Sequence, residues 1–183
     1  LSQAAKLMAQ AQAKTKEKYA KALANLHDII IDGTGAASRP LLKKKAELEA
    51  LGYETMMVMI YVSPVTSLER NAGRDRSLLP GTVLQTWEKV NSNIPIYKKE
   101  FGDNFILINN DPKDAETDFD AQEIKRRFFD TSKTKGKPKT PEEIAKRKAE
   151  VEAMNKSIEQ LVKQKPDFTS STDAVSKIKA FIK

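Results

Sequence analysis

The fold is decided by three stretches, HDIIIDGTGAASRP (residues 27–40), LGYETMMVMIYVSP (51–64) and SLERNAGRDRSLLP (67–80). The isoleucines at 29–31 are β-branched and apolar on both faces, which is typical of a strand buried between two layers of helices. Asp32 ends this strand, and a glycine-rich turn follows it. The next segment, from Ser38 to Gly52, has the apolar spacing of a helix, with a proline near its start and a glycine at its end.

Two more apolar runs predict strands, one at 56–62 and one at 105–109. Helical segments separate these strands, and Pro64 and Pro80 each begin one of the predicted helices. Strands that alternate with helices require right-handed crossovers and a parallel sheet. We therefore predict an α/β fold in which residues 29–32, 56–62 and 105–109 are parallel strands of one sheet with helices on both faces.

The carboxyl ends of such strands are where ligands bind, and Asp32 is predicted to lie there. A carboxylate in this place can hold a hydrated magnesium ion. Arg70 and Arg74 are four residues apart on one predicted helical face, whereas Arg76 points elsewhere, and guanidinium groups bind phosphate oxygens in a bidentate fork. Two alternatives stay open: Asp32-Gly33 is also a common turn, and the arginines can form a solvated helix end with nearby acids.

At this point residues 28–111 resemble the P-loop kinases, most closely the polynucleotide-kinase and zeta-toxin-like branch. The resemblance lies in a hydrophobic strand that ends in Asp32-Gly-Thr, in LGYETMMVMIYV as the next strand, and in LERNAGRDRSLLP as a helix-to-lid segment. It implies an incomplete P-loop NTPase-like fold, with Asp32 near the magnesium and the reacting groups and Arg70 and Arg74 as lid arginines on nucleotide phosphates. Thr34 and Arg76 are further nucleotide-binding candidates, and ATP and Mg²⁺ are the implied cofactors.

The resemblance also implies a function, the transfer of a phosphoryl group from ATP to a hydroxyl, with a nucleic-acid 5′-hydroxyl as one candidate. None of the seven glycines begins a G-x-x-x-x-G-K-[ST] phosphate loop. We therefore expect that loop in a missing amino-terminal segment of the same gene product, on a strand between those at 29–32 and 56–62, and we expect this chain alone to be inactive. The alternative is a non-catalytic nucleic-acid-binding or assembly protein on a kinase-like scaffold.

The composition indicates the kind of partner and the compartment to expect for this protein. The chain of 183 residues has a formal net charge of +7, which favours a polyanionic partner such as nucleic acid. The absence of cysteine excludes disulfides and zinc-thiolate sites and fits a reducing compartment. No apolar run is long enough to span a membrane, and no signal peptide is visible. We therefore predict a cytoplasmic protein with no membrane contact.

The rest of the chain divides by composition into regions that flank the α/β core. Residues 1–27 form an amphipathic helix, 28–112 the kinase-like core, 113–139 a short helix and a basic linker, and 140–183 a helical appendage. In the core, Val83, Trp87, Val90 and Ile94 recur at helical spacing, which favours packing over base stacking for Trp87. In the appendage, a near-heptad stripe from Ile144 to Val162 favours packing on its own domain over a long coiled coil.

Overall fold

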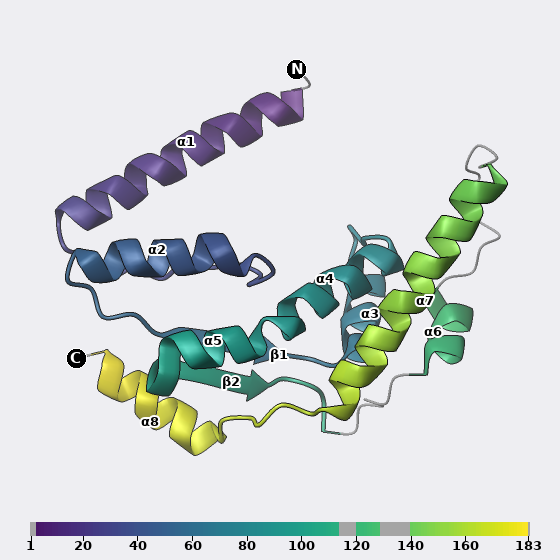
Figure 1. Cartoon of the computed structure of the whole chain (residues 1–183). Helices are drawn as coiled ribbons and strands as arrows, with labels where there is room; N and C mark the ends of the chain where they lie inside the picture. The colour runs from purple at the N-terminus through teal and green to yellow at the C-terminus, as the bar shows by residue number, and fades with distance from the viewer. Residues whose placement is uncertain (1–2, 114–119, 129–139, 183) are drawn as a thin grey trace. The chain divides into compact units, whose positions relative to one another are not determined.

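The computed structural model describes residues 3–113, 120–128 and 140–182 (Figure 1). Its contacts divide the chain into two compact units, Leu1–Gly33 and Thr34–Lys183. The helices are α1 (Gln3–Ala24), α2 (Ser38–Ala50), α3 (Pro64–Ala72), α4 (Pro80–Ser92), α5 (Ile94–Phe101), α6 (Ala121–Phe128), α7 (Pro141–Lys163) and α8 (Ser171–Phe181), with a 3-10 turn at Gly102–Asn104. The strands are β1 (Met57–Tyr61) and β2 (Phe105–Asn109). The protein is therefore mixed in class and mostly helical.

The strands β1 and β2 form a parallel pair, as the sequence predicts. Met57 lies opposite Phe105 and Tyr61 lies opposite Asn109, and three helices make the crossover between the strands. On one face of the pair, Met59, Tyr61 and Leu107 are buried in the main hydrophobic core. The same core holds Trp87, which is 6% exposed and whose indole N–H donates to Val62 O at 2.7 Å, so its prediction as a packing residue is confirmed.

The predicted strand at 29–32 is wrong. Residues 27–37 form neither helix nor strand, and the Ile30 side chain is 98% exposed. The peptide groups of this segment join no sheet, because within the described residues the sheet consists of β1 and β2 alone, and a strand forms only where its peptide groups are paired. Burial of β1 on both faces is also wrong, because its side chains alternate: Val58 and Ile60 remain 42% and 53% exposed.

The carboxyl-terminal helices pack on the same unit as the sheet. Helix α7 crosses α4 and α8 lies beside β2 (Figure 1). Ile158 of α7 is fully buried, and Met154, Leu161 and Val162 pack against the core, which confirms the predicted packing for this part of the stripe, whereas Val151 is 41% exposed. The Ile144 side chain and the basic linker at 131–139 lie outside the described residues.

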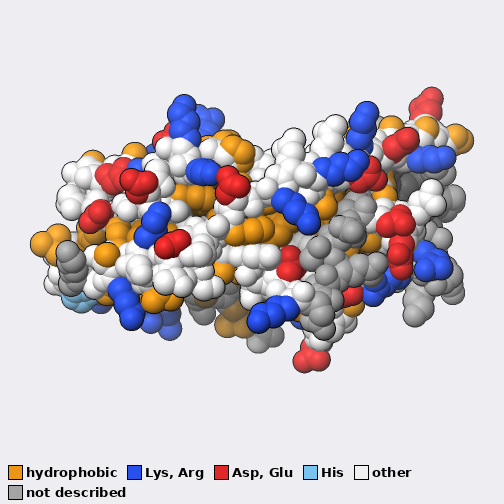
Figure 2. Space-filling model, turned by 90° about the horizontal axis from the view of Figure 1, so that it is seen from below, with side chains coloured by type: hydrophobic (Ala, Val, Ile, Leu, Met, Phe, Trp, Pro, Cys, Tyr) orange, Lys and Arg blue, Asp and Glu red, His pale blue; other side chains and the backbone are white. Residues whose placement is uncertain are grey.

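Several surfaces nevertheless remain apolar. Leu7 and Met8 of α1 are 61% and 65% exposed, so α1 is a helix as predicted but much of its apolar stripe is open within its unit. Figure 2 shows that apolar side chains also reach the surface between charged ones across the middle of the face it presents. No helix in the described ranges is both long and apolar enough to cross a membrane.

Candidate anion-binding site at the carboxyl ends of the strands

The loops that leave β1 and β2 meet at one end of the sheet, because parallel strands have their carboxyl ends on the same side. Asn110 N–H donates to Tyr61 O at 2.8 Å. The carboxylate of Asp111 accepts from Ser63 N–H, with its two oxygens at 2.8 and 3.0 Å from the nitrogen. Ser63 is also the N-cap of α3, since its hydroxyl accepts from Thr66 N–H at 3.1 Å. The start of α3 is thus fixed to the turn that follows β2.

Arg70 extends from the last turns of α3 across the same carboxyl end of the sheet. Its Nη2 donates to Asn110 O at 2.8 Å, which ties the helix to the carboxyl end of β2 a second time. A neighbouring pair, Arg127 and Glu69 at 3.0 Å, links α3 to α6. Arg70 is therefore placed at the carboxyl ends of the strands, where the sequence predicts it, but part of its guanidinium is already engaged by the protein.

A cavity of about 310 Å³ lies beside β1, between α3 and α4. Its polar side chains include Arg70, Arg74, Asn71 and Asn91. The apolar and aromatic lining comes from Met59, Ile60, Tyr61, Val62, Leu78, Val83, Trp87 and Val90. All of its strand residues belong to β1, so the cavity borders the side of the sheet away from β2. It can accept a ligand with an anionic group near the arginines and an apolar body along α4.

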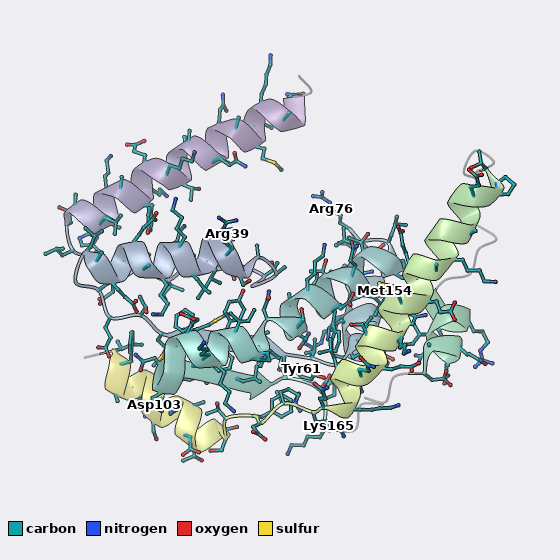
Figure 3. The ribbon with its side chains drawn as sticks, in the orientation of Figure 1. Arg39, Tyr61, Arg76, Asp103, Met154 and Lys165 are labelled. Carbon is teal, nitrogen blue, oxygen red and sulfur yellow. The ribbon has the colours of Figure 1, made fainter. Side chains whose placement is uncertain are left out.

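The structure brings Arg70 and Arg74 to this one cavity, while Arg76 is not part of its lining. Figure 3 shows Arg76 extending away from α3 and α4. One detail of the prediction is wrong, because α3 ends at Ala72 and Arg74 lies in the following loop. The last α-helical bond runs from the N–H of Gly73 to Glu69 O, at 3.1 Å, whereas the N–H of Arg74 bonds only three residues back, to Asn71 O at 3.3 Å, so the helical pattern stops before Arg74.

Asp32 and Thr34 lie in the irregular segment that precedes α2. Asp32 is exposed and does not end a strand, so the geometric reason for placing a magnesium ligand there is lost, although its assignment remains a prediction. Thr34 is exposed, and its hydroxyl accepts from Ala36 N–H at 3.4 Å. Asp32 belongs to the Leu1–Gly33 unit, whereas Arg70 and Arg74 belong to the Thr34–Lys183 unit. Within the described residues, no three acidic or histidine side chains gather around a possible metal ion.

Tyr61 adds an electrostatic feature at the end of β1. Burial and, as a smaller effect, the nearby Asp111 carboxylate together raise the pKa of its phenol to about 12. The phenol is therefore neutral at physiological pH and contributes an aromatic wall rather than a base. Its ring packs edge-on to Trp87, with centroids 6.1 Å apart, and against Phe168 at 5.1 Å.

Sequence reasoning missed three side chains of this site, Asn71, Asn91 and Asp111. The two asparagines are 7% and 8% exposed, and each is the second-last residue of a helix, in a stretch of apolar spacing where a polar amide needs a hydrogen-bonding partner. That mismatch was the signal available in the sequence. Asp111 gave no such signal, since an Asn-Asn-Asp-Pro turn needs no ligand to explain it.

Comparisons with protein-family models, with curated proteins and with solved structures found no match for this chain.

Proposed function

We propose that this chain is part of an ATP-dependent phosphotransferase that transfers a phosphoryl group to a hydroxyl. The observation that carries the proposal is the convergence of Arg70 and Arg74 on one cavity at the carboxyl end of a parallel strand. Phosphoryl transfer depends on cationic side chains that neutralise charge on the transferred group, and this is the part of the machinery that the two arginines can supply. A nucleic-acid 5′-hydroxyl is one candidate acceptor, which the net charge of +7 favours.

The magnesium ion of such a reaction needs few protein ligands. Mg²⁺ is usually held by one or two carboxylates together with nucleotide phosphates and water, so a single exposed carboxylate suits it chemically. We assign this role to Asp32, with Thr34 and Arg76 as further contacts to the nucleotide. The ion would supply charge neutralisation at the nucleotide phosphates.

Phosphoryl transfer also needs a phosphate cradle, and we propose that another segment of the gene product supplies it, since the 183 residues contain no G-x-x-x-x-G-K-[ST] motif. The free edge of β1 offers a place for it. Tyr61 O accepts from β2, so the alternating peptide groups of Val58 and Ile60 point to the other edge, where the described residues provide no strand. We propose that a strand from the same gene product pairs there and delivers its phosphate loop next to the cavity.

A second candidate is a non-catalytic nucleic-acid-binding or assembly protein that keeps this scaffold. The specific observation in its favour is the missing phosphate loop, combined with the excess of 32 basic over 25 acidic residues. In that case the arginines would bind a polyanion through salt-sensitive contacts, with no turnover.

Calorimetric titration with ATP–Mg²⁺ at physiological salt separates the two candidates. The chain is titrated alone and together with any residues that its gene encodes before Leu1. We expect no tight binding by the chain alone, because it lacks the nest of backbone donors for the phosphates, and tight binding by the longer form. Tight binding by the short chain would mean that the phosphate site is misplaced. No binding by either form would favour the non-catalytic protein.

A further inference from the structure

Asn71 hydrogen-bonds across the base of the loop that carries Arg74 and Arg76. Its side-chain amide makes two hydrogen bonds to one residue seven positions later: Nδ2 donates to Leu78 O at 2.9 Å, and Oδ1 accepts from Leu78 N–H at 2.9 Å. The asparagine is 7% exposed, so both bonds are largely shielded from water. The amide therefore copies the paired bonds of two antiparallel strands and closes residues 72–78 into a loop.

The side chains on this loop are free to meet a ligand. Within the described part of the chain, no hydrogen bond or ion pair holds the side chain of Arg74 or Arg76. Arg70, just before the loop, is different, because its guanidinium donates to Asn110 O. The loop thus has a fixed base and a tip, Arg74-Asp75-Arg76, with one net positive charge, and Arg74 lines the cavity.

Burial of an amide in a helix is costly unless its donors and acceptors are satisfied, and an apolar residue would pack there without that requirement. What the asparagine adds is order in a segment of seven residues that makes no regular structure until Pro80. A long arginine side chain on a loosely held loop loses binding free energy to the ordering of that loop. A loop already closed by Asn71 avoids most of this cost.

We infer that Asn71 is a positioning residue that holds the Arg74 loop ready to bind a polyphosphate anion. This inference rests on the proposed function, since it deepens the role of the same cavity, but its first test needs no catalysis. It also changes the assignment of the arginines: Arg74 becomes the main anion contact, and Arg70 becomes a second positioning residue through its bond to Asn110.

Inorganic tripolyphosphate is the probe, titrated into the wild-type chain, N71A, R74A and the double variant N71A/R74A. N93A is the matched control, because the Asn93 amide also donates to backbone groups far along the chain, Gly35 O and Ala36 O, both at 3.2 Å, but Asn93 is not part of the cavity lining. K43A controls for the loss of one positive charge, since Lys43 is an exposed residue on α2. Amide hydrogen exchange of Leu78 in the wild-type chain reports the fastening directly and needs no variant to fold.

We expect R74A to weaken tripolyphosphate binding by about 10- to 100-fold, as for the loss of one charge-assisted hydrogen bond or more. N71A should weaken it by about tenfold, N93A and K43A by less than about twofold, and N71A/R74A no more than R74A, because the two residues act as one unit. The Leu78 amide should exchange more slowly than those of Arg76 and Ser77. Wild-type binding by N71A, or an unprotected Leu78 amide, would overturn the inference, as would a wild-type chain that does not bind tripolyphosphate.

The two proposals fail in different ways. If the longer form transfers phosphate but N71A leaves kcat, KM and tripolyphosphate affinity unchanged, the positioning role falls and the phosphotransferase stands. If tripolyphosphate binding depends on Asn71 and Arg74 as described but no form of the protein transfers phosphate, the positioning role stands and the phosphotransferase falls.

Discussion

The two edges of the sheet differ in what covers them. Beside β2, Thr169 N–H donates to Leu107 O at 2.8 Å, and Leu107 N–H donates to the Thr169 hydroxyl at 3.1 Å, so the segment before α8 takes the place of a strand. Beside β1, no described residue forms a strand. β1 also has no charge, proline or bulge of the kind that usually protects an edge. A closed edge completes a domain, whereas an open apolar edge next to a cavity is a place for a partner or ligand.

The largest expected effect compares two isoleucines on the same face of the sheet. Ile106 of β2 is fully buried, and Ile60 of β1 is 53% exposed. I106A should lower the free energy of unfolding by about 2–5 kcal/mol, through lost apolar contact and a residual cavity. I60A should lower it by less than about 1 kcal/mol. Urea unfolding measures both.

Equal losses in the two variants would contradict an open β1 edge. In that case the unfolding of wild type should be repeated at several protein concentrations, because coverage of Ile60 by a second copy makes the midpoint depend on concentration.

The second effect concerns activity on the open side. In the complete protein, R74A should lower turnover by about a hundredfold if Arg74 neutralises charge in the transition state. The free energy of unfolding should stay within about 0.5 kcal/mol of wild type, because the residue is exposed. R126A is the control, since Arg126 is an exposed arginine on α6, outside the cavity lining. Wild-type turnover by R74A would remove this arginine from the site.

The sequence predicted the elements whose signals are local. Pro64 and Pro80 mark the starts of α3 and α4, and apolar runs mark β1 and β2. Periodicity fails at 29–32, because an apolar run shows that a segment could form a buried strand but not whether it pairs with another strand. The same triplet of isoleucines would be a good strand beside a partner.

For the candidate site, the sequence identified the arginines but not what holds them. Chain order and helical spacing bring Arg70 and Arg74 to one cavity, although Arg74 lies past the helix end. The bonds from Asn71 to Leu78 and from Asp111 to Ser63 join side chains to backbone groups across the chain. Such bonds depend on tertiary placement, and no residue pattern records them.

A third prediction tests whether water reaches the Tyr61 side chain on the cavity side of β1. Burial raises the pKa of Tyr61 from 10 to about 12, so in this pH range the unfolded chain has lost a proton that the folded chain keeps. The stabilisation from this group is therefore fully present below pH 10. Between about pH 10 and 12 the free energy of unfolding falls by about 1.4 kcal/mol per pH unit. Denaturant unfolding across this range should show a shallower decline in Y61F. The pKa of Tyr97 is also raised by burial, so Y61F should keep part of the slope. An identical slope in Y61F and wild type would mean that water reaches the Tyr61 phenol.

The smallest effect probes the closed edge itself. T169V keeps the shape of the side chain but removes the hydroxyl that accepts from Leu107 N–H, while the bond from residue 169 N–H to Leu107 O can remain. A partly buried amide then lacks a partner, so the free energy of unfolding should fall by about 1 kcal/mol. T86V is the matched control, because the Thr86 hydroxyl is exposed and donates only to its own helix, at Thr82 O. It should change the free energy of unfolding by less than about 0.5 kcal/mol.

Hydrogen exchange tests the same bond locally, because the Leu107 amide should exchange faster in T169V than in wild type or T86V. If it exchanges equally fast in wild type, the segment before α8 does not close this edge in solution, and the two edges of the sheet are alike.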